Sequence, residues 1–433
     1  MLENSRSELK SLRLYKEARS IPLHRDMYTQ DGWPEVENNS SLPGEGASVV
    51  HYVWCGRKVF QFQHQLSLLS AVRILRPLKI YFYYHHLPEV DDFWYHTWFQ
   101  ELTQSVPNLV LRHDNPCLII TQSVYPKDVW DNSSRFSELA RWIHYGRRGI
   151  IKVRQTDRPQ DYIPLISHLV LFPAKEQSAK STEFRFLHYL SVISALHVAG
   201  FKRVFVHGDE IPQGEWWDKL GGENVTFVKI EQPETVFQHG VAVPAHQSDV
   251  LRVLILLRYG GVYQDTDVIW VNRIPDDLRR YPAVVCNDWA RNGAWPGVFN
   301  IGVLMARAGS EYLKHFLRTF GYYRDDKWSF NAILMPYKVY EQHPDLLYVD
   351  RYLQATCYHG VCHPTWQPDY FRDILDENPV EPFDWRDARA FHFTAPKPPE
   401  SLSTPEKIKN GKDVFAEMGR MILEKSGRLD LLS

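Results

Sequence analysis

Apolar residues along the chain fall into short runs typical of strands, separated by longer runs with helical spacing. Val49–Trp54 is an apolar and aromatic run that indicates a strand, residues 60–75 show the helical pattern, and Lys79–Tyr84 again indicates a strand. This order predicts a β-α-β unit and places the chain in the α/β class. Residues 1–47 are polar and show neither pattern, so we expect an N-terminal arm there.

The same rhythm returns later in the chain with many of the same residues. Residues 60–71 align with residues 184–195, a shift of 184 − 60 = 124, and seven of the twelve aligned positions are identical. Further correspondences pair His51 with His168, residues 79–84 with 202–207, Ser137-Glu138 and Arg141 with Ser248-Asp249 and Arg252, and Tyr145-Gly146 with Tyr259-Gly260. Two unrelated amphipathic helices are the alternative, but several segments matching in order favour an internal duplication.

The two copies are unequal. With Gly146 aligned on Gly260, Ile151 and Val153 stand where the second copy has two aspartates. We therefore interpret the first copy as degenerate and of half length, and the second as the working domain. The predicted boundaries are 1–47 for the arm, 48–160 for the degenerate repeat, 161–400 for the working domain and 401–433 for a tail with one helix over 404–423.

A buried helix with defined ends precedes the aspartates of the second copy. Ser248 is expected as its N-cap, and apolar residues cover almost all of its faces. Gly260 is expected to take the left-handed conformation that ends the helix. Asp249 and Arg252 lie one turn apart on the same face, so they can reach one ligand or each other.

Asp265 and Asp267 interrupt an apolar strand predicted over residues 262–270. In an extended chain, residues i and i+2 point the same way, so both carboxylates face one side. Two like charges beside an apolar strand are costly unless a cation neutralises them, and Mn²⁺ or Mg²⁺ suits oxygen ligands. An acidic surface turn is the alternative. A glycosidase pair fits poorly, because its carboxylates flank the sugar from opposite sides.

The ordered set of Ser-Asp-x-x-Arg, a buried helix, Gly-Gly-x-Tyr and Asp-x-Asp resembles the sugar-transferase family that contains the DXD motif. This is the family-32 type of retaining glycosyltransferase, found in yeast mannosyltransferases and animal α-1,4-glycosyltransferases. The resemblance extends from His168 to the Phe-His-Phe at 391–393. It implies a GT-A fold, a Rossmann-like nucleotide-diphospho-sugar transferase with the nucleotide over the C-terminal ends of the strands.

The resemblance also implies an activity and its partners. A nucleotide-sugar, with UDP as the first choice, would donate a sugar to a hydroxyl of a glycan, lipid or protein acceptor, with a divalent metal (Mn²⁺ or Mg²⁺) as cofactor. A pseudo-transferase that binds nucleotide or glycan and regulates a partner is the alternative. A metal-dependent phosphodiesterase is weaker, because it needs more His and Asp ligands than the sequence offers here.

The same resemblance implies roles for individual residues. The catalytic positions are Asp265, Asp267 and Asp288, and the metal ligands are Asp265, Asp267 and His392. The donor-binding positions are His168, Asp209, Asp249, Arg252, Gly260, Gly261, Tyr263, Asn300 and Gly302, and those on the acceptor side are Trp328 and Asn331. For several of them a structural role is the alternative: a hydrogen-bonded His392, an ordinary turn before a strand at 303–305, or a core Trp328.

Two departures from the family pattern concern the nucleotide. The first strand of the working copy is expected at residues 168–172 and reads His-Leu-Val-Leu-Phe, whereas the degenerate copy keeps the more family-like His51-Tyr-Val-Trp54. An insertion, residues 173–182, follows that strand at the edge where the base or ribose would lie. Both leave the identity of the nucleotide open.

Composition adds limits. The net charge of −2 and the lack of a basic tail argue against nucleic-acid binding. The N-terminus lacks a signal-peptide core, and the apolar windows are too short to span a bilayer. Five cysteines are too few for a disulfide framework, although Cys357 and Cys362 can pair across a short loop in an oxidising compartment. Sequons at Asn38, Asn39, Asn132 and Asn224 are compatible with a lumenal protein, and localisation stays open.

Overall fold

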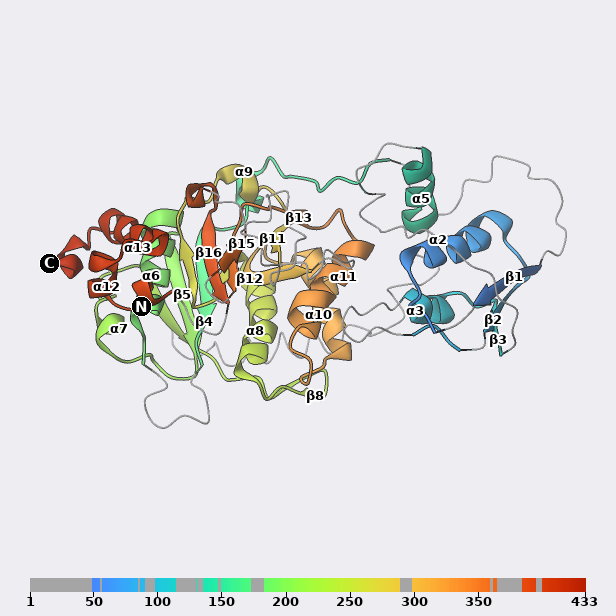
Figure 1. Cartoon of the computed structure of the whole chain (residues 1–433), viewed down its shortest axis with the longest axis horizontal. Helices are drawn as coiled ribbons and strands as arrows, with labels where there is room; N and C mark the ends of the chain where they lie inside the picture. Colours follow the sequence, from blue (N-terminus) through green and yellow to red (C-terminus); the bar gives the residue numbers. More distant parts are fainter. Residues whose placement is uncertain are drawn as a thin grey trace. The chain divides into compact units, whose positions relative to one another are not determined.

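The computed structural model of the chain (Figure 1) describes residues 49–54, 57–84, 86–89, 98–113, 130, 135–146, 149–172, 183–288, 298–358, 361–363, 384–394 and 399–433. Contacts divide the described residues into an N-terminal unit, up to Lys152, and a C-terminal unit, from Val153 onward. The expected arm at 1–47 and the insertion at 173–182 lie outside the described residues.

The N-terminal unit contains a three-stranded parallel sheet in the order β1-β2-β3. Its elements are β1 (Val49–Trp54), α2 (Phe62–Ser70) with a π-helical turn (Ala71–Leu75), β2 (Lys79–Tyr84), α3 (Trp98–Ser105), β3 (Leu109–His113) and α5 (Arg135–Tyr145). Both strands predicted from the apolar runs are confirmed with the same bounds. Helix α2 contacts α3 and α5, and its buried Phe62 lies against Trp98 of α3 with ring centroids 5.4 Å apart.

A seven-stranded mixed sheet forms the centre of the C-terminal unit, in the order β13-β11-β12-β9-β4-β5-β6. The strands are β4 (Ile166–Val170), β5 (Arg203–Gly208), β6 (Val225–Lys229), β9 (Gly261–Gln264), β11 (Ala283–Asn287), β12 (Phe299–Ala306) and β13 (Tyr348–Val349). Only β12 is antiparallel to its neighbours in this sheet. The α/β prediction is confirmed. The strand order changes direction between β4 and β9, and such a switch point is where open α/β sheets place ligands.

A second sheet lies beside the first in the order β10-β16-β14-β15. Its strands are β10 (Val268–Trp270), β14 (Ala355–Tyr358), β15 (Val361–His363) and β16 (Ala390–Thr394). A disulfide between Cys357 and Cys362 closes the β14–β15 hairpin, which confirms the pairing that the sequence allowed. Strand β16 runs antiparallel to β10 and parallel to β14, and so joins the end of the chain to its middle.

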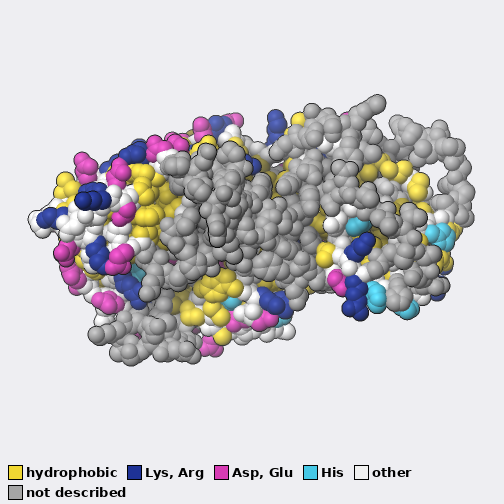
Figure 2. Space-filling model, viewed as in Figure 1, with side chains coloured by type: hydrophobic (Ala, Val, Ile, Leu, Met, Phe, Trp, Pro, Cys, Tyr) yellow, Lys and Arg dark blue, Asp and Glu magenta, His cyan; other side chains and the backbone are white. Residues whose placement is uncertain are grey.

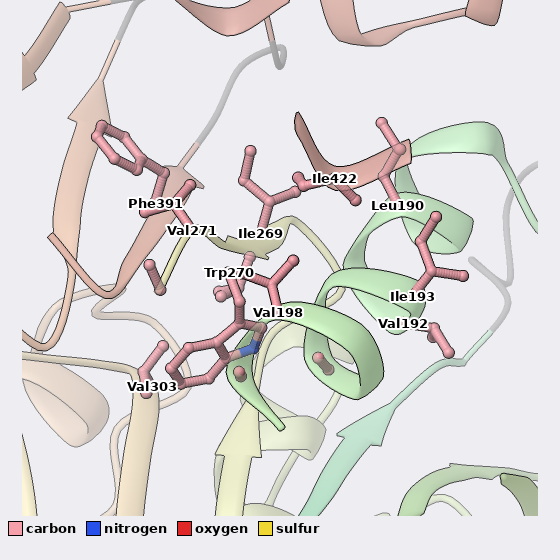
Figure 3. Close-up of a cluster of buried hydrophobic side chains, with 14 of the residues drawn as sticks. Leu190, Val192, Ile193, Val198, Ile269, Trp270, Val271, Val303, Phe391 and Ile422 are labelled. Carbon is pink, nitrogen blue, oxygen red and sulfur yellow. The ribbon is translucent and has the colours of Figure 1, made fainter. Parts of the chain in front are cut away.

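Helices cover both sides of the central sheet in Figure 1. On one side lie α6 (Phe186–Ser194), extended by a π-helical turn (Ala195–Ala199), and α13 (Val414–Lys425); on the other lie α8 (Pro244–Tyr259), α10 (Glu311–Thr319) and α11 (Met335–Gln342). Shorter elements are α7 (Glu215–Asp218), α9 (Asp276–Arg279), α12 (Pro405–Asn410) and the hairpin of β7 (Thr235–Val236) and β8 (His239–Gly240). The core is built where α6 and α13 meet β10, as the side chains of Leu190, Ile269 and Ile422 show (Figure 3).

Helix α8 differs from the prediction at both ends. It begins at Pro244, which tolerates the first turn because its missing N–H has no helical partner there, and Val243 is the N-cap. Ser248 lies inside the helix, where its hydroxyl donates to the Ala245 carbonyl (2.8 Å). Gly260 has a positive φ (63°) but an extended ψ (−170°), so it ends the helix without the left-handed conformation that was expected.

The tail forms two helices instead of the single one that was predicted. Helix α12 ends at Asn410 before Gly411, and α13 starts after Asp413. The Asp413 carboxylate accepts hydrogen bonds from the backbone N–H groups of Phe415 and Ala416, so Asp413 is the N-cap of α13. Basic and acidic side chains intermingle on this end of the unit in Figure 2. None of the helices in the described part of the chain combines the length and apolarity that crossing a membrane requires.

Candidate active site

Asp265 and Asp267 lie in the turn between β9 and β10, at the carboxyl end of β9 and beside the switch point of the sheet. The Val268 N–H donates to the Asp265 carbonyl (3.2 Å), so the predicted interruption of the strand is a turn, and the extended backbone assumed for the two aspartates is absent. The carboxylates still converge: ligand atoms of Asp265, Asp267 and His392 all lie within 4.8 Å of one another. The turn, rather than strand alternation, is the reason.

Strand pairing brings His392 to the two aspartates from 125 residues away in sequence (392 − 267 = 125). In the β10–β16 register Val268 is opposite His392, and the Phe393 N–H donates to the Asp267 carbonyl (3.2 Å). The His392 Nε2 lies 3.4 Å from Asp265 Oδ2 and 3.3 Å from Asp267 Oδ1. A side chain that was expected here from the family resemblance is therefore placed by a long-range backbone ladder.

Hydrogen bonding fixes the tautomer of His392. The Asn300 Oδ1 accepts the Gly302 N–H (2.9 Å), which identifies this atom as oxygen, and it lies 2.9 Å from His392 Nδ1. Nδ1 must then donate, so the lone pair of a neutral His392 is on Nε2, facing two carboxylates. Burial would lower the pKa of His392, but Asp267, Asp265 and Asp288 outweigh it and raise that pKa. Either a proton or a metal cation resolves the repulsion at this point.

Two carboxylate oxygens and one imidazole nitrogen suit a divalent ion of the Mn²⁺ type. The Nδ1–H of His392 donates to Asn300 Oδ1. Histidines that bind a metal through one ring nitrogen generally donate a hydrogen bond from the other in this way. The Asp265 and Asp267 side chains are 25% and 34% exposed, so a ligand can approach the cluster from solvent. The residues present therefore fit the metal that the motif implies.

Arg252 ties the metal loop to helix α8. Its Nη2 lies 2.8 Å from Asp249 Oδ1 and 3.1 Å from Asp265 Oδ1, and its Nη1 donates to the Ile301 carbonyl (2.7 Å). The guanidinium also lies over the Tyr263 ring, 4.3 Å from its centroid. With a side chain only 4% exposed, Arg252 is a buried cation shared by two carboxylates.

The acids around Arg252 are unlike one another. Asp249 is buried, which raises its pKa to about 6 although Arg252 acts in the opposite direction. Asp265 accepts from both Arg252 and the Tyr263 hydroxyl (2.9 Å), so its Oδ1 is held while Oδ2 faces His392. Asp249 and Arg252, predicted to reach one ligand or each other, are thus bonded to each other.

Gly302 is in β12, directly behind the cluster. A methyl group at this position would overlap the His392 ring and lie 2.9 Å from the Asp265 carboxylate. The Gly302 carbonyl also accepts the Asp265 N–H (2.8 Å). Residues 299–302 therefore belong to a strand rather than to the ordinary turn considered as an alternative, and the close approach concerns the metal ligands.

His168 is buried in β4 with both ring nitrogens engaged by the protein. Its Nε2 donates to the Gly260 carbonyl (3.1 Å), which leaves Nδ1 to accept from His207 Nε2 (3.0 Å). Burial lowers the pKa of His168 to about 4, so the pair is neutral. Gly261, at φ 107°, has no room for a side chain beside Ile166. Donor binding by His168 and these glycines stays a prediction. Because both ring nitrogens of His168 are already bonded, these residues could contribute to it only by shaping the backbone.

The other predicted residues lie around this centre. Asp209 follows β5 and accepts from Gln232 (2.9 Å); Asp288 follows β11 and is close enough to influence His392. Trp328 is in a turn and 63% exposed, which excludes the core role considered for it. The Asn331 amide bonds the backbone of Arg324 at both its oxygen and its nitrogen. The donor- and acceptor-side assignments of these residues stay predictions.

Sequence reasoning missed His246 and Asp325. Their side chains meet one turn before Asp249 on α8, with His246 Nδ1 2.8 Å from Asp325 Oδ1. His246 precedes Asp249 by three residues, and this helical spacing was the available signal. It was hidden because the helix was expected to begin only at Ser248.

Part of the chain is similar to known proteins. Residues 203–285 match the family model described as the glycosyltransferase sugar-binding region containing the DXD motif. Glucan organizing enzyme 1 of Cryptococcus neoformans var. grubii serotype A (strain H99) is 25% identical over 244 residues, covering 55% of this chain and 64% of that protein. This chain therefore spans slightly less than two thirds of its relative's length.

Two solved structures overlap more loosely. PaToxG glycosyltransferase is 15% identical with a TM-score of 0.31, covering 42% of this chain and 70% of that chain. The glycosyltransferase GlyE of Streptococcus pneumoniae TIGR4 is 13% identical with a TM-score of 0.33, covering 60% of each chain. Such scores do not define a shared fold, whereas the motif match is local and specific. Residues 203–285, which include the loop of Asp265 and Asp267, match the glycosyltransferase sugar-binding region containing the DXD motif.

Proposed function

We propose that the chain is a metal-dependent retaining glycosyltransferase of the GT-A type, which moves a sugar from a nucleotide-sugar to an acceptor hydroxyl. One observation carries the proposal: Asp265, Asp267 and the Nε2 of His392 converge at the switch point of an α/β sheet, inside or beside the matched sugar-binding region. Ligands of open α/β sheets bind at this place.

Three residues would bind the metal, and three others hold these ligands in position. Asp265 Oδ2, Asp267 Oδ1 and His392 Nε2 would hold the divalent cation, which when bound offsets the negative charge of a departing diphosphate. Arg252 holds Asp265 in place, Asn300 keeps the His392 lone pair on Nε2, and the missing side chain of Gly302 leaves room for both. This arrangement is preorganised, because the buried partners are already bonded.

The donor and acceptor are proposed from the family resemblance and from the name of a relative. UDP-sugar is the first donor to test, because of the resemblance to α-1,4-glycosyltransferases. The name of the Cryptococcus relative, a glucan organizing enzyme, suggests a glucan among the acceptors. Retention of the anomeric configuration also comes from the resemblance, and proton NMR of the anomeric signal in the first product formed tests it directly.

The decisive experiment measures both metal binding and turnover. We expect the purified chain to release nucleoside diphosphate from one of UDP-glucose, UDP-galactose, UDP-N-acetylglucosamine or GDP-mannose with Mn²⁺, and to stop when EDTA is added. Asp267→Ala should lower the rate at least about 100-fold and weaken Mn²⁺ binding in calorimetry. The matched control is Asp276→Ala, which removes a 77% exposed carboxylate of α9 that does not belong to the three-residue cluster and should change neither.

Two outcomes contradict the proposal in different ways. Unchanged turnover in Asp267→Ala would remove the metal role. Tight binding of UDP and Mn²⁺ by the wild-type chain, with no turnover of any donor and acceptor, would instead favour a regulatory pseudo-transferase.

A further inference from the structure

His246 and Asp325 form a buried pair at the start of α8. The His246 side chain is 3% exposed, and its Nδ1 lies 2.8 Å from Asp325 Oδ1. The other oxygen of Asp325 accepts the Ala242 N–H (3.0 Å). Burial would raise the pKa of Asp325, but the hydrogen bonds from His246 and Ala242 outweigh it and lower that pKa. An ionised carboxylate only accepts, so Nδ1 carries a proton, and the lone pair of a neutral His246 is then on Nε2.

The Nε2 of His246 has no hydrogen-bond partner among the described residues, although it is buried. A buried polar atom without a partner costs about 1–3 kcal/mol. Such an atom is rare in a folded protein and requires an explanation. A ligand group that donates a hydrogen bond would supply the missing partner.

Trp328 provides an apolar surface next to this nitrogen. Its indole lies against the imidazole of His246, with ring centroids 5.3 Å apart, yet most of the indole is exposed to solvent. The loop that carries Trp328 is braced, because the Asn331 amide accepts from the Arg324 N–H (2.9 Å) and donates to the Arg324 carbonyl (2.7 Å). An exposed aromatic ring beside a buried polar atom is the combination that a pyranose needs, since the sugar has an apolar face and a rim of hydroxyls.

His246 lies on the same helix, α8, as the residues that contact the metal loop. On α8, His246 and Asp249 are neighbours at three-residue spacing, and so are Asp249 and Arg252. Along a helix axis, six residues correspond to about 9 Å. Arg252 in turn bonds Asp265, so the helix that carries His246 also braces the metal loop.

We propose that Trp328 and His246 form a subsite for a pyranose of the acceptor glycan. The sugar ring stacks on the indole, and one of its hydroxyls donates a hydrogen bond to His246 Nε2, with a rotation of the exposed indole uncovering the nitrogen. Asp325 acts as a positioning residue that holds the imidazole in the required tautomer. This inference rests on the proposed glycosyltransferase activity, and it adds the residues that select the acceptor.

Two pairs of variants test the subsite. His246→Asn keeps a donor near Nδ1 for Asp325 but removes the Nε2 acceptor, whereas His246→Gln places a polar group near Nε2. Trp328→Ala removes the stacking surface, and Trp328→Phe restores most of it. Tyr352→Ala, at an exposed aromatic residue elsewhere on the unit, is the matched control.

The measurements separate acceptor from donor. We expect the acceptor KM to rise about 3- to 10-fold in His246→Asn and about tenfold in Trp328→Ala, with partial recovery in the Gln and Phe variants. Donor hydrolysis without acceptor should stay within twofold of wild type. Calorimetry with laminarihexaose and maltohexaose should show the same losses in affinity for whichever oligosaccharide the wild-type chain binds.

Several results overturn the subsite while leaving the proposed activity intact. One is a rise in donor KM with no change in acceptor KM, which would place the donor sugar on Trp328. Others are equal affinities in all variants, or no binding of either oligosaccharide by a wild-type chain that hydrolyses its donor. If no donor is hydrolysed at all, the proposed activity fails, and oligosaccharide binding that depends on Trp328 and His246 still decides the subsite.

Discussion

The two segments that align in sequence also share local geometry, although they belong to different units. In the N-terminal unit His51 is opposite Tyr81, and its Nδ1 lies 3.0 Å from the Tyr83 hydroxyl. In the C-terminal unit His168 is opposite Phe205, and its Nδ1 lies 3.0 Å from His207 Nε2. The isolated bridges Val59–Glu89 and Glu183–Gln213 are related by the same shift of 124 residues (183 − 59 and 213 − 89). The internal duplication stays a prediction, which this shared geometry supports.

The units differ in what covers the sheet. The His168 ring is buried and donates to the Gly260 carbonyl at the end of α8, whereas His51 is exposed between the exposed Val49 and Val53. In the N-terminal unit the aligned helix, α5, contacts α2. The β-α-β scaffold is therefore common to both units. The candidate metal site depends on elements that follow this scaffold in the chain: the turn of Asp265 and Asp267 after β9, and the strand β16.

The largest difference between the two units is expected when one methyl group is added to a glycine in each. In Gly302→Ala the new methyl overlaps His392, so we expect donor turnover to fall about 100-fold and the free energy of unfolding to drop by about 1–3 kcal/mol. Gly149→Ala, in the N-terminal unit, has no atom within 4 Å of its new carbon and should change neither quantity. Turnover assays and urea unfolding measure both. If the two variants behaved alike, the His392 ring would have room for a methyl group at position 302.

A smaller effect is expected where the two histidines align. His168→Ala leaves the His207 N–H and the Gly260 carbonyl without partners in a buried place, so it should destabilise the protein by about 2–3 kcal/mol. His51→Ala removes an exposed ring and should stay within about 0.5 kcal/mol of wild type. Urea unfolding at neutral pH measures both. A large loss in His51→Ala would show that its face of the sheet is covered in solution.

The smallest effect concerns the two helix starts, which are alike. His64 Nδ1 accepts from the Gln61 N–H (2.8 Å), and His188 Nδ1 accepts from the Arg185 N–H (3.2 Å). In each case burial, followed by a neighbouring cation, lowers the histidine pKa from 6.5 to about 4. The native state therefore binds fewer protons than the unfolded state between these values. Stability is complete above pH 6.5 and is lost as the pH falls toward 4.

Glutamine substitutions sharpen this point, since glutamine keeps an acceptor at the same helical position and does not titrate. For the buried His188 the loss between pH 6.5 and 5 is about 2 kcal/mol, and His188→Gln should remove it. His64→Gln should give a smaller change, because His64 is partly exposed. Unfolding curves at pH 7.5 and 5.0 measure the difference. An unchanged acid sensitivity in His188→Gln would reject the cap as its source.

Local pattern was sufficient where local forces decide. The apolar runs at Val49–Trp54 and Lys79–Tyr84 matched the strands residue for residue, because β-branched and aromatic side chains favour the pleated backbone of a sheet. Cap positions were less accessible. Thr404 does cap a helix, α12, but Asp413 caps a second helix that the single predicted one did not foresee. Helix α8 begins at Pro244 instead of Ser248, where Asp325 contacts the Ala242 N–H just before the helix.

The candidate site shows the same limit. Asp265, Asp267 and Arg252 were found because they lie close together in sequence around one helix and one turn. His392 required the family resemblance, because the β10–β16 ladder that delivers it joins distant segments. His246 with Asp325 left no trace beyond a helical spacing, since a contact between a helix and a remote loop is not encoded in either pattern alone.

The disulfide-closed hairpin has a practical consequence for anyone who prepares this protein. Cys357 is opposite Phe393 in the parallel pairing of β14 with β16, one residue away from His392. A chain produced in a reducing cell would carry thiols beside that strand, while a chain secreted through an oxidising compartment would carry the cross-link. Metal affinities measured on the two preparations describe different molecules, so the redox history of each sample should be recorded with every binding constant.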